Sequence, residues 1–140
     1  MKDVTLCEKA LKAMENAYVP YSGYKVGAAL LTKTGKVFTG CNIENAAYGP
    51  TVCGERTAIF KAVSEGYREF SSIAVCGGKD GKIEGAFPPC GVCRQVMAEF
   101  CAPDFKILVV TGENPVTYRE YRLSELLPEA FTPSHLSKEC

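Results

Sequence analysis

Two short cysteine segments constrain this chain more than any other feature of its sequence. The segment Cys53-Gly54-Glu55 brings together one thiol and one carboxylate, and Pro89-Cys90-Gly91-Val92-Cys93 brings two further thiols. Three thiolates can hold a zinc ion and leave its fourth position open, with the carboxylate beside it as a proton carrier. The fold must therefore carry two segments that are distant in the sequence to one point.

Each cysteine segment stands where a helix is expected to begin. A helix N-terminus carries partial positive charge and unpaired N–H groups, which favour the thiolate that zinc requires. Cys90 and Cys93 are three residues apart, so their side chains share one helix face. Cys53 and Glu55 are two apart, which would separate them in a regular helix. We therefore expect Cys53 at or before the first helical residue.

A centre of three thiolates and one divalent ion carries a net charge of about −1, which opposes the activation of bound water. A nearby cation should offset this charge. Arg56 follows Glu55 directly, and its guanidinium can donate to thiolate sulfurs. Arg94 is the alternative for this role.

A Cys-x-x-Cys pair alone is also typical of a structural zinc site or a redox pair. A structural site needs a fourth protein ligand. Cys76 and Cys101 are expected in a strand and at a helix end, where they are interpreted as buried apolar side chains. The single histidine, His135, lies in a tail with Ser and Pro and is interpreted as a surface residue. These readings favour the open site.

Length and charge limit the possible functions. The 140 residues, of which 46% are hydrophobic, predict a single domain over residues 1–140. Lys plus Arg and Asp plus Glu are equal at 16 each, so no basic field exists to bind a nucleic-acid polymer. No apolar run suits a signal peptide or a membrane span, so we expect a cytoplasmic protein without a membrane partner. In a reducing compartment, the eight cysteines indicate metal binding or catalysis rather than disulfides.

The hydrophobic pattern predicts alternating helices and strands after an initial hairpin. We first expect an amphipathic helix over residues 4–18 with Asp3 as its N-cap, and then a hairpin of strands 26–32 and 37–41. A helix from Cys53 to a Gly66 cap follows, and then a strand over 72–76 bounded by Gly77-Gly78. The rest of the chain should form a helix from Cys90 to Pro103, a strand over 106–111, a helical turn at 124–127 and an irregular tail. This order predicts an α/β fold with helices on the faces of a mixed sheet. The strands flanking the Cys90 helix should be parallel, because such crossovers are right-handed.

Five motifs, in register over nearly the whole chain, resemble those of the small homotetrameric zinc-dependent cytidine deaminases of the cytidine/deoxycytidylate deaminase superfamily. They are PYS (residues 20–22), VGAAL (26–30), GCNIENAAY (40–48), ERTA (55–58) and PCGVCRQ (89–95). The resemblance implies a three-layer α/β/α fold with a mixed five-stranded sheet. It also implies one zinc ion per subunit and a homotetramer with shared active sites.

The same resemblance implies the reaction. Zinc-bound hydroxide would attack C4 of cytosine, with Cys53, Cys90 and Cys93 as zinc ligands. Glu55 would carry the proton from water to the ring nitrogen and the departing amine. Cytidine and deoxycytidine would give uridine and deoxyuridine with release of ammonia, a step of pyrimidine salvage.

The nucleoside contacts implied by the resemblance begin with Asn42 and Glu44. These residues alternate around Ile43, so in an extended segment they face the same way, and they would anchor the ribose through its 3′-hydroxyl. Tyr24 stands where the family usually has a phenylalanine that packs on the base. Its ring is retained, and its added hydroxyl needs a partner.

Further implied contacts come from the backbone and from neighbouring subunits. The backbone around Ala46 and Gly54 would read the pyrimidine edge, with Gly54 in place of the usual alanine. Pro88 replaces a usual serine or threonine and keeps the carbonyl that accepts from the leaving amine. Tyr48 and Phe131 would reach active sites across subunit interfaces, although Phe131 can also be read as an anchor of the terminus.

Two other functions remain open from the sequence. Aminonucleoside-antibiotic deaminases of the blasticidin type share the zinc motifs, although Asn42-Ile43-Glu44 favours a ribose site. A non-catalytic, zinc-stabilised binding module is disfavoured by Glu55 and by the lack of a convincing fourth ligand.

Overall fold

A mixed five-stranded sheet forms the middle layer of the protein, whose computed structural model describes residues 1–136. Along the chain, the elements are α1 (Asp3–Met14), β1 (Tyr24–Thr32), β2 (Val37–Cys41), α2 (Gly54–Ser64), β3 (Phe70–Lys79), α3 (Gly91–Phe100), β4 (Lys106–Glu113), β5 (Val116–Arg122), α4 (Leu123–Leu126) and a 3₁₀ turn, Pro133–His135. The strand order is β2-β1-β3-β4-β5. The eighth cysteine, Cys140, lies outside the described residues.

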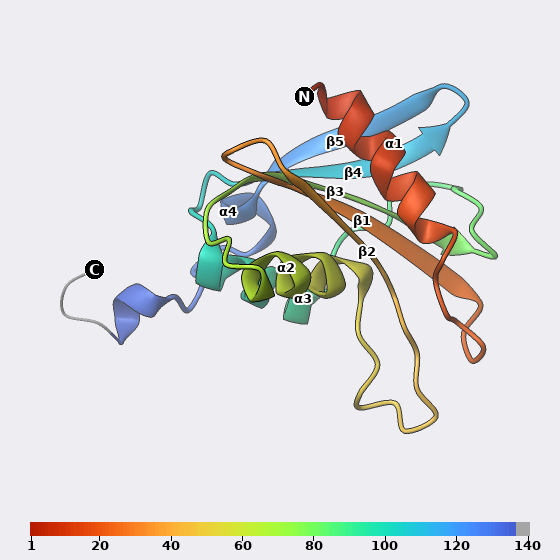
Figure 1. Cartoon of the computed structure of the whole chain (residues 1–140), viewed down its shortest axis with the longest axis horizontal. Helices are drawn as coiled ribbons and strands as arrows, with labels where there is room; N and C mark the ends of the chain where they lie inside the picture. The colour runs from red at the N-terminus through yellow and green to blue at the C-terminus, as the bar shows by residue number, and fades with distance from the viewer. Residues whose placement is uncertain (137–140) are drawn as a thin grey trace.

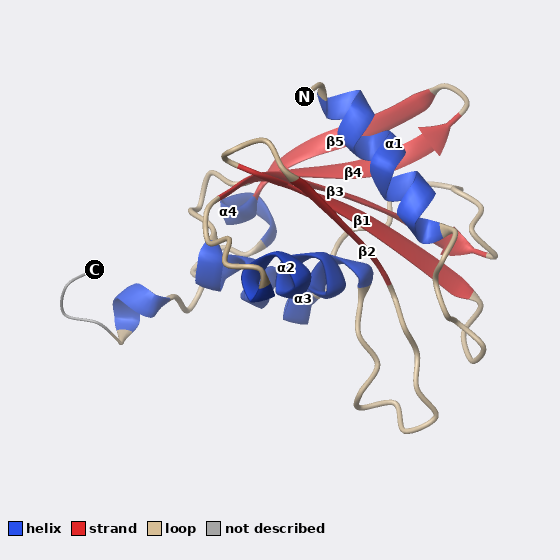
Figure 2. Cartoon of the chain, in the orientation of Figure 1, coloured by secondary structure: helices blue, strands red, loops and turns tan. Residues whose placement is uncertain are grey.

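The helices cover both faces of this sheet, which gives the expected three layers (Figures 1 and 2). Strand residues alternate between the two faces. Leu30, Ile73 and Val109 belong to the core beneath α2 and α3, whereas Ala74 and Leu108 belong to the core beneath α1. Each face is thus closed by its own apolar cluster, and α2 and α3 share one face.

The connection from β3 through α3 to β4 sets the position of the second cysteine segment. β3 and β4 pair in parallel, as the crossover rule predicts, while the other neighbouring strands pair antiparallel. Because α3 follows β3 and α2 follows β2, both helices start at the same end of the sheet. Within residues 1–136, no helix is both long and apolar enough to span a membrane.

The first helix is shorter than its hydrophobic pattern predicts. It ends at Met14 rather than near residue 18, because Tyr18 leaves the helix and pairs with Ile43 in an isolated bridge. Asp3 is the first helical residue rather than the N-cap, which is Lys2. The Asp3 carboxylate instead accepts from Lys106 Nζ at 2.8 Å, which ties α1 to the start of β4.

Two sheet features were not predicted from the sequence. Gly77 and Gly78 were expected to bound the third strand, but β3 continues through them to Lys79 because β1 pairs along its full length, with Tyr24 opposite Lys79. The edge strand β5 was missed because most of its residues are exposed and carry little apolar signal. Both the extent of β3 and the presence of β5 depend on pairing with a neighbouring strand, which the local sequence does not show.

Gly40 explains how closely the start of α2 approaches the sheet. A Cβ atom at this position of β2 would lie 2.5 Å from the Gly54 carbonyl oxygen and 2.6 Å from the Ala58 nitrogen. Only glycine permits this approach without a shift of the backbone. The contact fixes the N-terminus of α2, and with it Cys53, against the end of β2.

Candidate active site

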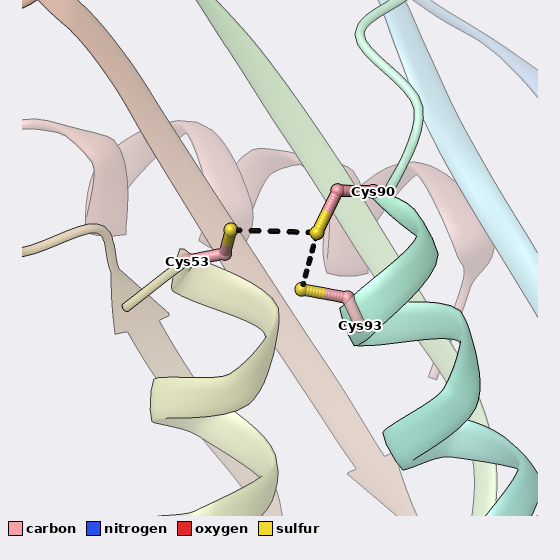
Figure 3. A group of neighbouring side chains, drawn as sticks. All are labelled: Cys53, Cys90 and Cys93. Atoms are coloured by element: carbon pink, nitrogen blue, oxygen red, sulfur yellow. Dashed lines mark hydrogen bonds between the residues drawn. The ribbon is translucent and has the colours of Figure 1, made fainter. Parts of the chain in front are cut away.

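The first turns of α2 and α3 bring three cysteines together (Figure 3). Cys53 is the N-cap of α2 and Cys90 the N-cap of α3, both with extended backbone, and Cys93 follows in the first turn of α3. The Sγ atoms of Cys53 and Cys90 lie 3.7 Å apart, and those of Cys90 and Cys93 lie 3.5 Å apart. All three sulfurs lie within 4.8 Å of one another. Cys53 therefore takes the position that the sequence predicts.

This cluster has the chemistry and spacing of a zinc site. Sulfurs bound to one tetrahedral zinc at ~2.3 Å lie ~3.8 Å apart, close to the spacing of Cys53, Cys90 and Cys93. Both helix N-termini direct partial positive charge at the thiols, which favours thiolate ligands. In the described part of the chain these cysteines form the only group that meets the geometry of a metal site. The three side chains fit zinc, and no fourth ligand from the described residues joins them.

Hydrogen bonding shifts the pKa values of Cys53 and Cys93 in opposite directions. Hydrogen bonds, foremost from Cys93, lower the pKa of Cys53 to about 5, whereas the bond to Cys53 and burial raise the pKa of Cys93. Arg56 Nη2 donates to Cys53 Sγ at 3.5 Å. Burial works against the charge of Arg56, but its hydrogen bonds to Cys53 and Cys93 raise its pKa. A fixed cation thus faces the sulfurs.

Arg94, the alternative cation, is bound elsewhere. Its Nε donates to the Pro89 carbonyl and its Nη1 to the Leu126 carbonyl, both at 2.7 Å. These bonds tie α3 to the segment before it and to α4. The guanidinium of Arg94 therefore supports the second cysteine segment through the backbone.

Glu55 lies in the first turn of α2 and is only 2% exposed. Within residues 1–136, its Oε1 atom has no hydrogen-bond partner. Burial raises the pKa of this carboxyl to about 7. A buried polar atom without a partner is costly in a folded protein, so Oε1 is available to a ligand that enters beside the cysteines.

Asn42 and Glu44 both bind the segment that leads into β1. Asn42 is 9% exposed; its Nδ2 donates to the Tyr24 carbonyl at 2.8 Å, and its Oδ1 accepts from the Val26 N–H at 2.9 Å. The Glu44 carboxylate accepts from the Tyr21 and Ser22 N–H groups, each at 3.0 Å. The two side chains thus face the same neighbouring segment, as alternation around Ile43 predicts.

Tyr24 stands beside Lys79, the last residue of β3, and Phe87, in the loop before α3. Its ring stacks near that of Phe87, with centroids 6.1 Å apart and planes at 19°. Lys79 Nζ lies 5.2 Å from the Tyr24 ring centroid and donates to the Ser22 carbonyl at 3.0 Å. Tyr24 is therefore held at the sheet end from which α2 and α3 start.

The other candidate residues occupy different surroundings. Ala46 and Tyr48 are exposed in the long loop between β2 and α2 (Figure 1), Gly54 is buried at the start of α2, and Pro88 is exposed just before α3. Phe131 is 57% exposed in the segment after α4, stacks on His135, and its carbonyl accepts from Gln95 Nε2 at 2.8 Å. Within one chain, the three cysteines, Glu55 and Arg56 therefore lie together, whereas Tyr48 and Phe131 are exposed.

A family comparison explains this arrangement. The model of the cytidine and deoxycytidylate deaminase zinc-binding region matches residues 1–109, which include all three clustered cysteines and Glu55. The chain belongs to this deaminase family. A cytidine deaminase of Halalkalibacterium halodurans is 50% identical over 94% of this chain and 96% of its own length.

Solved cytidine deaminases share the fold of this family member. The crystal structure of the Burkholderia pseudomallei protein superposes with a TM-score of 0.85 at 48% identity, over 94% of this chain and all of that chain. The Mycobacterium tuberculosis protein gives a TM-score of 0.74 at 40% identity, over 91% and 94% of the two chains. The expected three-layer deaminase fold is confirmed.

Sequence reasoning did not single out Ser22 or Phe87 as parts of this deaminase site. Ser22 is the last residue of the PYS motif, but its partner Glu44 is far along the chain. Phe87 lies in a polar, glycine-containing loop, where an aromatic residue gives no periodic signal. Only the closeness of Phe87 to the cysteine segment in the sequence could have indicated that it belongs to the site.

Proposed function

We propose that this protein is a zinc-dependent deaminase that hydrolyses cytidine and deoxycytidine to uridine and deoxyuridine, with release of ammonia. The observation that carries the proposal is the buried Glu55 carboxyl, whose free oxygen lies in the turn that begins at the three-thiol cluster. A structural zinc site has no need of such a carboxyl. Family membership supports the same reaction.

Cys53, Cys90 and Cys93 would hold the zinc, with one ion per subunit. When bound, zinc supplies Lewis acidity that makes water nucleophilic at neutral pH. Arg56 offsets the excess negative charge of the thiolates by donating to Cys53 Sγ. Glu55 accepts the proton of the attacking water and delivers it to the ring nitrogen and the departing amine.

The nucleoside would be held by residues around the start of β1. Asn42 and Glu44 bind the ribose 3′-hydroxyl, and the ring of Tyr24 packs on the base. Backbone groups at Ala46 and Gly54 contact the pyrimidine edge. The carbonyl of Pro88 accepts from the leaving amine.

The proposed assembly is a homotetramer with shared active sites. Tyr48 is 75% exposed and Phe131 57% exposed, and aromatic residues are enriched at protein–protein interfaces relative to the rest of the surface. Each would complete the site of a neighbouring subunit. Residues 1–140 would form one catalytic domain of pyrimidine salvage, acting in the cytoplasm, where cysteine ligands stay reduced.

A cytidine assay tests this function directly. Purified protein loaded with zinc is mixed with cytidine, and the loss of absorbance in the cytosine band is followed while ammonia release is measured. We expect equal amounts of uridine and ammonia. Fully loaded protein that leaves cytidine unchanged would contradict the proposal, and protein that also leaves blasticidin S unchanged would favour a non-catalytic binding module.

A second substrate class is supported by one relative. A protein named blasticidin-S deaminase, from Bacillus cereus, is 30% identical over 94% of this chain. Competition between cytidine and blasticidin S separates the two functions. Turnover of the antibiotic at a higher kcat/KM than cytidine would make the aminonucleoside the preferred substrate.

A further inference from the structure

The carboxylate of Glu44 is fixed by three hydrogen bonds from one short turn. Its Oε1 atom accepts from the backbone N–H groups of Tyr21 and Ser22, each at 3.0 Å. Its Oε2 atom accepts from the hydroxyl of Ser22. Residue 22 therefore binds both oxygens of one carboxylate, through its backbone and through its side chain.

A fourth hydrogen bond determines the direction in which Ser22 donates. The Tyr24 N–H donates to Ser22 Oγ at 3.0 Å. A hydroxyl has one proton to give, and Glu44, as an ionised carboxylate, can only accept. The chain therefore runs from Tyr24 N–H to Ser22 Oγ and from the Ser22 hydroxyl to Glu44.

These contacts leave a defined part of Glu44 available. A carboxylate offers about four acceptor positions. Oε1 uses two of them and Oε2 uses one, so one acceptor position remains on Oε2. Glu44 also lines a surface hollow of about 290 Å³, whose walls are formed by Tyr21, Ser22, Tyr48 and Thr51. A ligand hydroxyl that enters this hollow can donate to the remaining position.

We infer that Ser22 is a positioning residue for the nucleoside sugar: its hydroxyl locks the Glu44 carboxylate so that the last acceptor position of Oε2 meets the 3′-hydroxyl. This inference rests on the proposed function. Without the hydroxyl, the two backbone N–H groups still hold Oε1, but Oε2 loses its donor and is less firmly positioned for the sugar. The hydrogen bond from Ser22 also lowers the pKa of Glu44, which keeps the acceptor charged.

The contribution of Ser22 is separable from that of Asn42. Asn42 is held by the Tyr24 carbonyl and the Val26 N–H, within the start of β1. It keeps one N–H donor and one acceptor position for a ligand. Ser22 touches neither atom of that amide. Its hydroxyl contacts Glu44 and the Tyr24 N–H, so its removal should weaken the Glu44 contact and leave both Asn42 hydrogen bonds in place.

A matched pair of variants tests the role of the hydroxyl. Ser22 is exposed, so Ser22→Thr and Ser22→Val are both tolerated and differ only in the presence of the hydroxyl. We expect Ser22→Val to raise the KM for cytidine on the order of 10-fold, since hydrogen bonds to charged groups are strong. Ser22→Thr should stay near the wild type, and kcat should change little in both variants.

A change of substrate provides the readout that a structural role would not produce. With 3′-deoxycytidine the sugar has no hydroxyl for Glu44, so Ser22→Val and Ser22→Thr should have equal kcat/KM. Ser64→Ala is the control, because Ser64 Oγ donates only to the Lys61 carbonyl at the end of α2. Its kinetics with both substrates should match the wild type.

The possible results separate the inference from the proposed function. Equal KM values of the Val and Thr variants for cytidine would overturn the role of Ser22, as would equal losses with cytidine and 3′-deoxycytidine. Wild-type protein that does not deaminate cytidine would overturn the proposed function, and the inference with it.

Discussion

At the scale of single residues, Glu55 combines burial with a free oxygen atom beside a thiol cluster. Glu55→Gln preserves shape and removes the ability to carry a proton. We expect kcat for cytidine to fall by about 10²-fold to 10⁴-fold, since this is the usual worth of a positioned acid or base. Zinc content, measured by atomic absorption, should remain one per subunit.

The control for this change is Glu65→Gln. Glu65 is exposed and caps the C-terminal end of the same helix, away from the cysteines. Its variant should keep wild-type kcat. Retained activity in Glu55→Gln would remove Glu55 from the reaction.

Glu44 leads to a prediction about pH. Hydrogen bonds, foremost from the Ser22 hydroxyl, lower the pKa of Glu44 below its ordinary value of 4.5. A lowered pKa means that the charged form is present above the ordinary value and is lost only as the pH falls through the lowered one. Ionisation of Glu44 should therefore leave the KM for cytidine unchanged between pH 7 and about 4.5 and should raise the KM below that.

The Ser22 variants allow this effect to be isolated. In Ser22→Val the rise in KM should begin at a higher pH than in Ser22→Thr, because the hydroxyl hydrogen bond that favours the carboxylate is lost. Comparing the two variants in the same buffers cancels acid effects on the metal site. Coincident pH profiles would contradict this account of Glu44.

At the scale of elements, Phe87 anchors the loop before α3. A Cβ atom at Gly77 of β3 would lie 2.5 Å from Phe87 Cδ2, so the ring occupies the space that a strand side chain would otherwise fill. The same ring stacks near Tyr24. Phe87 thus fixes Pro88 and the start of the Cys90 segment relative to the sheet.

We expect Phe87→Ala to lower the free energy of unfolding by about 1–3 kcal/mol, because a half-buried ring loses its packing. The KM for cytidine should also rise, since Tyr24 loses a neighbour. Urea unfolding and steady-state kinetics measure both effects. Glu84→Ala, at an exposed position of the same loop, is the control, and an equal loss in both variants would show that the anchor is not Phe87.

The elements that could be predicted from the sequence are those whose signal is local. Helical spacing and the Cys53 and Cys90 caps locate α2 and α3, and the crossover rule gives the parallel pairing of β3 and β4. The position of β5 could not be predicted from the hydrophobic pattern, because most of its residues are exposed, although the family resemblance implies a fifth strand. Gly77 and Gly78 read locally as a boundary, yet pairing with β1 keeps them in the strand.

The residues of the candidate site also differ in whether the local sequence is enough to predict them. Spacing alone predicts that Cys53, Cys90 and Cys93 can share an ion, and the structure brings them together. The hydroxyl of Ser22 and the ring of Phe87 gain their roles from partners that only the fold supplies. Ser22 belongs to the PYS motif, but neither this motif nor the position of Phe87 in the sequence shows the partner that gives the residue its role.

At the scale of the whole molecule, the cysteine cluster links two separate parts of the chain. Cys53 comes from the connection after β2, and Cys90 and Cys93 come from the connection after β3. Zinc bound only by the folded chain would stabilise it by about 4 kcal/mol at a free concentration 1,000 times its dissociation constant. Removal of zinc with a chelator should therefore shift urea unfolding to a lower concentration.

Cys90→Ala provides the matched test of this linkage. The variant should lose zinc and unfold at the urea concentration of the chelated wild type, with no further effect of chelator. Cys101→Ala is a control, because Cys101 lies at the end of α3, outside the cluster. A chelator effect that persists in Cys90→Ala would place the stabilising metal elsewhere.

If the active sites are shared as proposed, two defective variants can restore activity to each other. Phe131→Ala should raise the KM on the order of 10-fold by removing an aromatic cover from a neighbouring site. Glu55→Gln inactivates its own site but still supplies Phe131. When the two variants are co-expressed with different tags and mixed assemblies are purified, about one quarter of the sites combine Glu55 from one subunit with Phe131 from another.

Activity is measured at cytidine concentrations far below the KM, where the loss in Phe131→Ala is largest. The mixed assemblies should exceed the average of the two separate variants, because only sharing creates intact sites. Glu55→Gln mixed with the double variant Glu55→Gln, Phe131→Ala is the control and should be inactive, since no subunit then supplies the carboxyl. Mixed assemblies whose rate equals the simple average would mean that each subunit works alone, and that the exposed Phe131 only anchors the terminus through Gln95 and His135.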